Sequence, residues 1–155
     1  MTTLFIPNSE DMERLGQRLA LHCPNPMLIF LVGDLGAGKT TVVRGFLRGL
    51  GHQGSVKSPT FTLVEPYEVN ERTIFHFDLY RLEDPEELEA FGIRDYLGQP
   101  AITFIEWPER AKDILPTPDL YCYISLQNEG RNITFQSHSE RGLHLIQQMM
   151  QDGRN

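Results

Sequence analysis

The sequence has little cysteine and no long apolar run. Its two cysteines, Cys23 and Cys122, are 99 positions apart, and neither has a Cys or His beside it at the spacing of a zinc site. The sequence therefore predicts neither a disulfide framework nor a zinc centre. No apolar stretch approaches the ~18 residues of a membrane span, and the first residues turn acidic before any signal-like apolar segment. We expect a cytoplasmic protein that does not contact a membrane.

Positive charge is also scarce. The chain carries 14 Lys and Arg residues against 21 Asp and Glu residues, a net charge of −7, and 14 of the acidic residues lie between positions 61 and 120. A protein that binds nucleic acid by itself normally presents a basic face to several phosphates. The composition therefore disfavours direct RNA or DNA binding and suits a basic protein partner better.

A glycine-rich loop is the strongest signal in the sequence. The run Met27–Val32 is apolar without alternation, which is typical of a strand buried on both faces. Directly after it, the segment GDLGAGKT at 33–40 matches G-x-x-x-x-G-K-[ST] at every fixed position. Such a loop aims backbone N–H groups at phosphate oxygens, and its lysine and hydroxyl reach the β/γ phosphates and Mg²⁺. The alternative is an ordinary glycine-rich turn. The predicted ATP-binding residues here are Gly33, Gly36, Ala37, Gly38, Lys39 and Thr40.

Apolar periodicity predicts one domain, residues 1–155, of alternating strands and helices around this loop. No internal repeat or low-complexity segment interrupts the chain. The fold class is therefore α/β, a P-loop NTPase-like three-layer fold with a mixed, parallel and antiparallel, central sheet. Residues from 61 are expected to pair with 73–78, and 120–126 with 132–136, as hairpins. Further strands are expected at 4–6 and 101–106, and helices after Asn8 or Ser9, from 39 to 50, from 85 to 91 and from 139 to 150.

Two acidic residues close predicted strands. Asp78 follows Ile74–Phe77, and Glu106 follows Ile102–Ile105. The carboxyl ends of strands collect the catalytic residues of such folds, and a P-loop site needs an acidic residue there to hold Mg²⁺. The alternative for either residue is a simple cap on the exit of its strand. The sequence leaves open which of the two binds the metal and which orients the attacking water.

Three further positions lie near these strand ends. Thr60, in the SPT segment at 58–60, stands where switch proteins keep a threonine that senses the γ-phosphate, and the alternative is a plain turn. Trp107 directly follows Glu106, and we interpret it either as core packing or as a loop anchor or partner contact. His76 alternates with the buried positions of its strand, which is more typical of a satisfied structural histidine than of a catalytic one.

The motifs together resemble the bacterial TsaE family. They follow one another in the order of the family, and SPT, HFDLYR and EWP at these spacings are far more specific than the P-loop alone. The matching segments are GDLGAGKTT at 33–41, KSPTFTLVEPY at 57–67, HFDLYRL at 76–82, DPEELEAFGIRDYL at 84–97 and IEWPER at 105–110.

This resemblance implies a P-loop ATPase that works with TsaB, TsaC and TsaD. The reaction it implies is threonylcarbamoylation of the adenosine next to the anticodon in tRNAs that read codons starting with A. Such a protein binds the TsaB–TsaD pair and hydrolyses ATP to support turnover, and it does not transfer the threonylcarbamoyl group itself. It is expected to meet tRNA only indirectly, through that complex.

The resemblance also implies roles for single residues. Arg131, in the predicted hairpin tip, resembles a family position near the adenine, where a guanidinium can stack on the base. The guanine-reading motif N-K-x-D does not occur in the sequence, so ATP is expected rather than GTP. The other implied roles are phosphate and Mg²⁺ contacts for Lys39, Thr40 and Thr41, the second protein ligand of the metal for Glu106, a catalytic or switch role for Asp78, and a functional role for Trp107.

Two other functions compete with this interpretation. A small-molecule P-loop kinase would need an acceptor pocket and usually an arginine-bearing lid, and a chain of 155 residues has no insertion of that size. A nucleotide-dependent binding module would release its partner without hydrolysis. Phosphate release with and without the partner proteins, and a screen of phosphate acceptors, separate the three.

Overall fold

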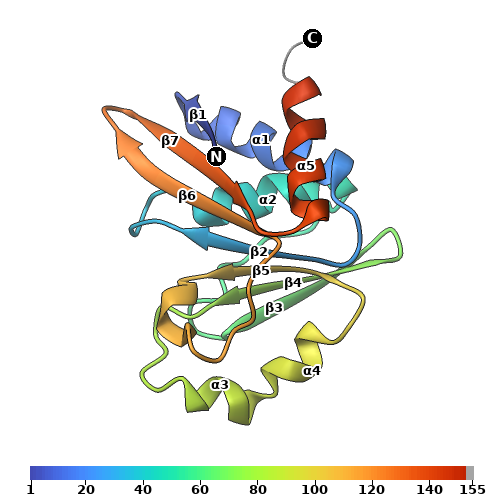
Figure 1. Cartoon of the computed structure of the whole chain (residues 1–155), viewed down its shortest axis with the longest axis vertical. Coiled ribbons are helices and arrows are strands. Elements are labelled where there is room, and N and C mark those ends of the chain that lie inside the picture. The colour runs from blue at the N-terminus through green and yellow to red at the C-terminus, as the bar shows by residue number, and fades with distance from the viewer. Residues whose placement is uncertain (153–155) are drawn as a thin grey trace.

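The protein folds around a seven-stranded sheet with helices on both faces (Figure 1). The computed structural model describes residues 1–152. The strands are β1 (Thr2–Ile6), β2 (Met27–Val32), β3 (Val64–Val69), β4 (Arg72–Asp78), β5 (Ile102–Glu106), β6 (Leu120–Gln127) and β7 (Gly130–Ser137). The helices are α1 (Ser9–His22), α2 (Lys39–Leu50), α3 (Glu86–Phe91), α4 (Ile93–Leu97) and α5 (Glu140–Asp152), with a 3₁₀ turn at Pro108–Ala111. None of these helices is long and apolar enough to cross a membrane.

The strand that leads into the glycine-rich loop lies in the middle of the sheet. The strand order is β1-β7-β6-β2-β5-β4-β3, and β2 runs parallel to both of its neighbours, β5 and β6. The hairpins β3–β4 and β6–β7 add antiparallel pairs, and β1 pairs antiparallel with β7. The predicted mixed sheet and both predicted hairpins are confirmed. Because β2, β5 and β4 are parallel, their carboxyl ends lie side by side at one edge of the sheet.

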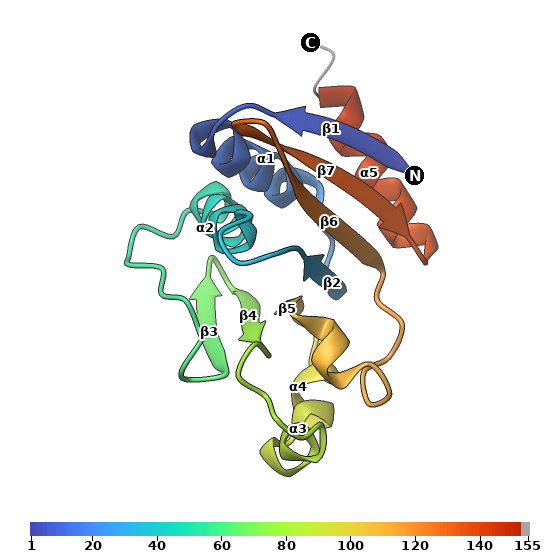
Figure 2. The same ribbon diagram turned by 90° about the vertical axis from the view of Figure 1, so that its left-hand side faces the viewer.

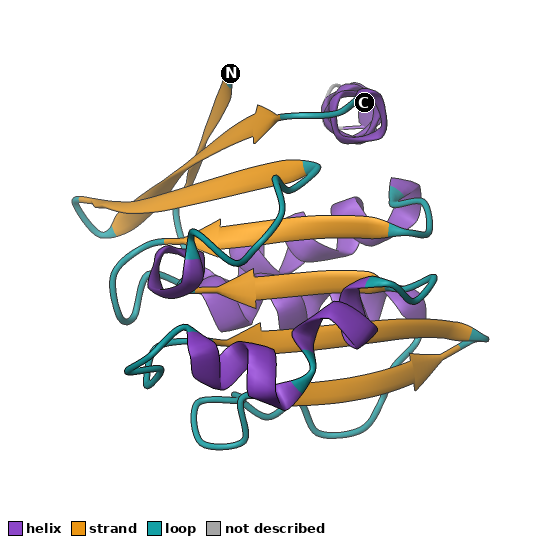
Figure 3. Ribbon diagram, turned by 60° about the horizontal axis from the view of Figure 1, so that its bottom comes forward, coloured by secondary structure: helices purple, strands orange, loops and turns teal. Residues whose placement is uncertain are grey.

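Helices on the two faces of the sheet make the predicted three layers (Figures 2 and 3), and an apolar cluster lies on each face. Helices α1, α2 and α5 cover one face, where the rings of Phe46 in α2 and Phe104 in β5 have centroids 4.9 Å apart. Helices α3 and α4 and the 3₁₀ turn cover the other face, where the rings of Phe77 and Tyr96 have centroids 5.3 Å apart. The sheet is therefore buried on both sides over its central strands.

The two-residue period of a strand decides which side chains face α2. Ile74 of β4 and Ile102 of β5 belong to the core beneath α2. The side chains of His76, Asp78 and Glu106 stand an even number of positions further along the same strands, so they share that face. Both acidic residues consequently end their strands on the side of the glycine-rich loop.

Glycines allow α1 to lie directly against α2 (Figure 2). A Cβ atom added to Gly45 of α2 would lie 2.0 Å from the carbonyl oxygen of Glu13, and one added to Gly16 of α1 would lie 2.2 Å from that of Val42. Backbone therefore meets backbone where the two helices cross. This close approach brings the start of α1, capped by Asn8, beside the start of α2.

One local prediction is wrong, and one element was not predicted. The strand expected from Phe61 begins only at Val64, because Leu63 N–H donates to the Pro59 carbonyl at 2.9 Å and Leu63 takes a positive φ of 71°, which closes a turn. The chain after Gly92 forms an additional short helix, α4, that the sequence pattern did not predict. Gly92, with φ of 92°, ends α3 as expected, but the chain coils again because the apolar side chains that follow pack into the second core.

Candidate functional site

The glycine-rich loop joins the end of β2 to the start of α2. Gly36 and Gly38 have positive φ angles of 78° and 113°, a conformation that other residues adopt only with strain. Gly38 is also the N-cap of α2, so no cap side chain occupies the first N–H groups of this helix. These groups and the positive end of the helix dipole are therefore available to an anion.

Lys39 lies folded against this loop. Its side chain is buried, and Nζ donates to the carbonyl oxygen of Gly33 and, at 3.3 Å, to that of Asp34. The same Nζ atom lies 4.1 Å from the ring centroid of Trp107. Burial lowers the pKa of Lys39, whereas nearby carboxylates, Glu106 foremost, act in the opposite direction. The ammonium group thus lies at the loop and is partly dehydrated.

Glu106 and Asp78 reach the loop from adjacent strands and have different partners. Glu106 ends β5, directly beside β2, and its Oε2 accepts a 3.1 Å hydrogen bond from Oγ1 of Thr40. Asp78 ends β4, one strand further from β2, and accepts from Oγ1 of Thr60 at 3.0 Å and from the N–H of Tyr80 at 2.9 Å. Glu106 is therefore hydrogen-bonded to the start of α2, and Asp78 to the SPT segment.

The oxygen atoms gathered at the start of α2 suit Mg²⁺. This ion favours hard oxygen ligands and is usually held by one or two carboxylates together with substrate phosphates and waters. The hydroxyl of Thr40 and the carboxylate of Glu106 offer that donor set. Residues 1–152 contain no group of three or more His, Cys, Asp or Glu side chains arranged to hold a metal by themselves. The residues present therefore fit a metal that is bound together with phosphate.

One cavity brings most of the predicted site residues together. It measures about 240 Å³ and lies at the carboxyl ends of β2, β4 and β5. Trp107 forms part of its wall with φ of 58° and ψ of 47°, a left-handed conformation that is strained for a tryptophan. The predicted residues that line this cavity are Gly36, Ala37, Gly38, Lys39, Thr40, Thr41, Thr60, Asp78, Glu106 and Trp107.

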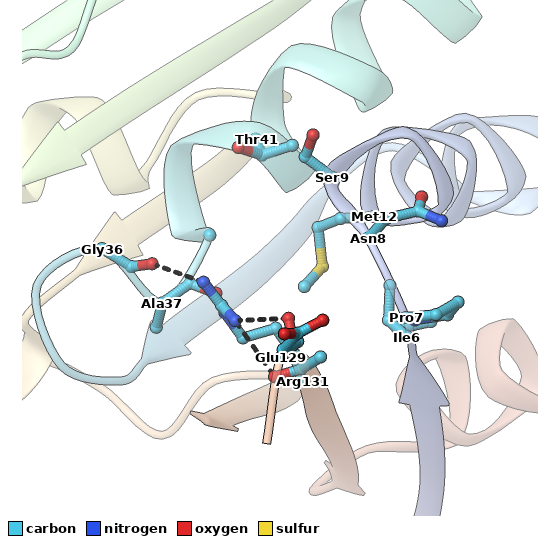
Figure 4. Close-up of a pocket in the computed structure, with 12 residues that line it drawn as sticks. Ile6, Pro7, Asn8, Ser9, Met12, Gly36, Ala37, Thr41, Glu129 and Arg131 are labelled. Atoms are coloured by element: carbon cyan, nitrogen blue, oxygen red, sulfur yellow. Dashed lines mark hydrogen bonds between the residues drawn. The ribbon is translucent and has the colours of Figure 1, made fainter. Parts of the chain in front are cut away.

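A second cavity, of about 190 Å³, borders the same loop at Gly36–Gly38 (Figure 4). Arg131 of β7 reaches the loop from the hairpin 94 residues further along the chain, and its Nε donates to the Ala37 carbonyl at 3.0 Å. A terminal nitrogen of the same guanidinium donates to the Gly36 carbonyl at 3.2 Å. Arg131 therefore lines the second cavity and is hydrogen-bonded to the two loop residues, Gly36 and Ala37, that border both cavities. The other residues around this cavity are Ile6, Pro7, Asn8, Ser9, Met12, Gly38, Thr41, Glu129 and Gly130.

Comparison with known proteins identifies the family of this chain. The family model described as Threonylcarbamoyl adenosine biosynthesis protein TsaE matches residues 6–134. The chain belongs to the TsaE family. The matched range contains every predicted site residue, Arg131 included, and extends beyond the motifs that carried the resemblance.

Individual TsaE relatives match over nearly the whole chain. The tRNA threonylcarbamoyladenosine biosynthesis protein TsaE of Haemophilus influenzae is 48% identical over 149 residues, which cover 93% of this chain and 94% of the relative. The protein of the same name from Bacillus subtilis is 33% identical over 143 residues, which cover 92% and 89%. The crystal structure of Bacillus subtilis YdiB matches with a TM-score of 0.84 and 26% identity, covering 98% of this chain and 95% of that one.

Two features of this TsaE-family site escaped the sequence interpretation. The segment Ile6–Ser9 and Met12 line the second cavity, and only the close packing of α1 on α2 brings them there. His76 is buried, as expected of a structural histidine, but it is only half satisfied: Nε2 is hydrogen-bonded to Glu106, whereas Nδ1 has no hydrogen-bond partner within residues 1–152. The signal that could have found His76 is its even spacing from Asp78, which places both side chains on the face of α2.

Proposed function

We propose that this TsaE-family chain is a Mg²⁺-dependent ATP hydrolase that acts in tRNA threonylcarbamoyladenosine biosynthesis with TsaB and TsaD. The observation that carries the proposal is the 3.1 Å hydrogen bond from Thr40 to Glu106 at the start of α2. It joins a phosphate-binding loop to an acidic residue of the neighbouring strand, the combination used by P-loop phosphoryl-transfer sites. The pathway comes from the name that the relatives share.

The loop and four side chains of the first cavity have roles in this proposal. The N–H groups of the loop and the ammonium of Lys39 bind the β and γ phosphates, while Thr40 and Glu106 hold the metal. Mg²⁺, when bound, supplies positive charge at those phosphates. Asp78 lines the same cavity on the side of Glu106 away from β2, and we assign it to orienting the attacking water.

The second cavity suits the adenine and ribose of the nucleotide. It adjoins the loop at Gly36–Gly38, so one nucleotide can occupy both cavities with its phosphates on the loop. Hydrogen bonds to the loop fix the guanidinium of Arg131 at the cavity wall. A planar cation held in this way can stack on a purine base.

Replacing Arg131 with alanine should weaken ATP binding by roughly 2- to 30-fold, the range of a cation–π contact of about 0.5–2 kcal/mol. Inorganic tripolyphosphate occupies the loop without a base, so its affinity should stay unchanged. Titration calorimetry of both ligands on the two proteins measures this difference. Equal losses for ATP and tripolyphosphate would show that Arg131 supports the loop rather than the base.

The SPT segment offers a route from the nucleotide to a partner protein. Thr60 contacts Asp78 inside the first cavity, and the next residue, Phe61, is 82% exposed with the Arg81 guanidinium 4.2 Å from its ring centroid. A segment ordered by the γ-phosphate would therefore rearrange an exposed apolar side chain on hydrolysis. The acidic stretch 83–89 follows nearby in the chain and suits a basic partner surface, although favourable charge at a helix start also accounts for it.

We expect slow ATP hydrolysis by the isolated protein and faster hydrolysis when TsaB–TsaD is added. Coupling of about 1–3 kcal/mol would make the affinity for TsaB–TsaD differ by roughly 5- to 150-fold between the states with an ATP analogue and with ADP. Phosphate release and partner titrations with ATP analogue, ADP and no nucleotide measure both effects. Equal affinities in the three states would remove the switch and leave an ATPase. Transfer of phosphate to a small acceptor, instead of release, would favour the kinase.

A further inference from the structure

A buried histidine lies beside the proposed metal ligand. His76 of β4 stands opposite Phe104 of β5 and is 0% exposed. Its Nε2 atom lies 2.5 Å from Oε2 of Glu106. Because a carboxylate oxygen only accepts hydrogen bonds, Nε2 carries the proton and donates it to Glu106.

The two donors to Glu106 meet on one oxygen. Oε2 accepts from Nε2 of His76 and from Oγ1 of Thr40, the latter at 3.1 Å. Two hydrogen bonds use the two lone-pair directions of that oxygen and hold a side chain that otherwise rotates about several bonds. No donor within residues 1–152 reaches Oε1, so this second oxygen is left for a ligand.

The ring of His76 has no other polar partner in the described structure. Nδ1 is buried and makes no hydrogen bond within residues 1–152. An unpaired buried polar atom is unfavourable, and the neighbouring core positions on the same face are Ile74 and Phe104. Packing alone would therefore be served better by an apolar side chain at position 76. The bond to Glu106 is the interaction that accounts for a histidine.

A Glu106 side chain without this bond would have a competing partner. Of the charged groups that act on Lys39, Glu106 acts most strongly. A released carboxylate would be drawn toward the ammonium and would neutralise charge that the phosphates need. His76 pulls Oε2 to the β4 side and so keeps Glu106 aligned with Thr40.

We infer that His76 is a positioning residue that holds Glu106 in place as the protein's carboxylate ligand for Mg²⁺ in the nucleotide complex. The inference rests on the proposed function, since it requires a metal at Glu106. A positioning role differs from a merely structural one in what a substitution of His76 changes. It should change the Mg²⁺ requirement and leave the metal-free nucleotide affinity unaltered. Outer-shell partners of metal ligands typically change metal affinity by about 10- to 100-fold.

The test compares H76L, H76N and H76Q in nucleotide binding without turnover. A fluorescent ADP analogue is titrated at fixed Mg²⁺ concentrations and in EDTA, which separates the Mg²⁺ requirement from the metal-free affinity. H76L and H76N should raise the Mg²⁺ concentration for half-maximal effect by about tenfold. The amide nitrogen of Gln reaches the place of Nε2, whereas that of Asn reaches only the place of Nδ1. H76Q should therefore have a Mg²⁺ requirement close to that of the unsubstituted protein. Metal-free affinity should not change in any variant.

A double variant and a control complete the experiment. If His76 acts through Glu106, then H76L should add nothing to the Mg²⁺ requirement of E106Q. His144 is exposed on α5, and H144L should behave as the unchanged protein. An unchanged Mg²⁺ requirement in H76L, or an equal added loss in the E106Q background, would overturn the inference. If nucleotide binding by the unsubstituted protein does not depend on Mg²⁺, the proposed function itself is refuted.

Discussion

Replacing Lys39 with alanine should slow ATP hydrolysis by roughly 30- to 1,000-fold while the protein stays folded. The estimate corresponds to losing about 2–4 kcal/mol of transition-state stabilisation from one charged contact in a water-poor site. Lys39 is 5% exposed and donates to two carbonyl groups of its own loop. Lys39 itself lines the open cavity, so water can take the place of its ammonium in the variant without loss of the fold.

Steady-state phosphate release and thermal unfolding of the same samples measure these two effects separately. The matched control is Lys112→Ala, which removes an exposed lysine far from the loop in sequence. It should hydrolyse ATP at the normal rate. Near-normal hydrolysis by folded Lys39→Ala would contradict the assignment of residues 33–40 as a phosphate-binding loop.

Replacing Glu106 with glutamine should raise the Mg²⁺ concentration needed for nucleotide binding by about 10- to 100-fold. The change keeps the size of the side chain and its capacity to accept from Thr40 and His76, but removes the charge that a hard cation requires. Asp78→Asn should change this requirement by less than about threefold, because Asp78 contacts Thr60 and the Tyr80 N–H rather than the start of α2.

The two variants are compared by titrating Mg²⁺ at fixed ATP analogue, followed by measurement of turnover at saturating Mg²⁺. At saturation, Asp78→Asn should keep a large defect in turnover, because orienting the attacking water is unaffected by metal concentration. For Glu106→Gln, saturating Mg²⁺ should recover part of the lost turnover. A larger Mg²⁺ requirement for Asp78→Asn than for Glu106→Gln would reverse the two roles.

The acidic pair shows how far sequence reasoning reached. Asp78 and Glu106 each close an apolar run, so both could be recognised as strand-end carboxylates near the loop. Which of the two contacts the start of α2 depends on strand order, since β5 lies beside β2 and β4 lies one strand beyond β5. Strand order follows from pairing between segments far apart in the chain, and no local pattern encodes it.

Arg131 and His76 illustrate the same limit. The resemblance placed Arg131 near an adenine, but its contact with Ala37, 94 residues away, exists only because β7 and the loop meet in the folded sheet. His76 looked like a core residue because a period-2 pattern reports burial and not the partner. Its bond to Glu106 requires β4 and β5 to be neighbours in the observed register.

Local patterns in the chain were sufficient for the α/β class, the glycine-rich loop between the strand that ends at Val32 and the helix that follows, both hairpins and the helix that ends at Gly92. Each of these depends on a few consecutive residues, through apolar period, glycine conformation or turn residues. Tertiary structure alone decided that Glu106 lies at Thr40, that α1 and β7 close a second cavity beside the loop, and that His76 donates to Glu106. These features arise where strands and helices distant in sequence pack together, and the free energy of that packing is a property of the whole chain.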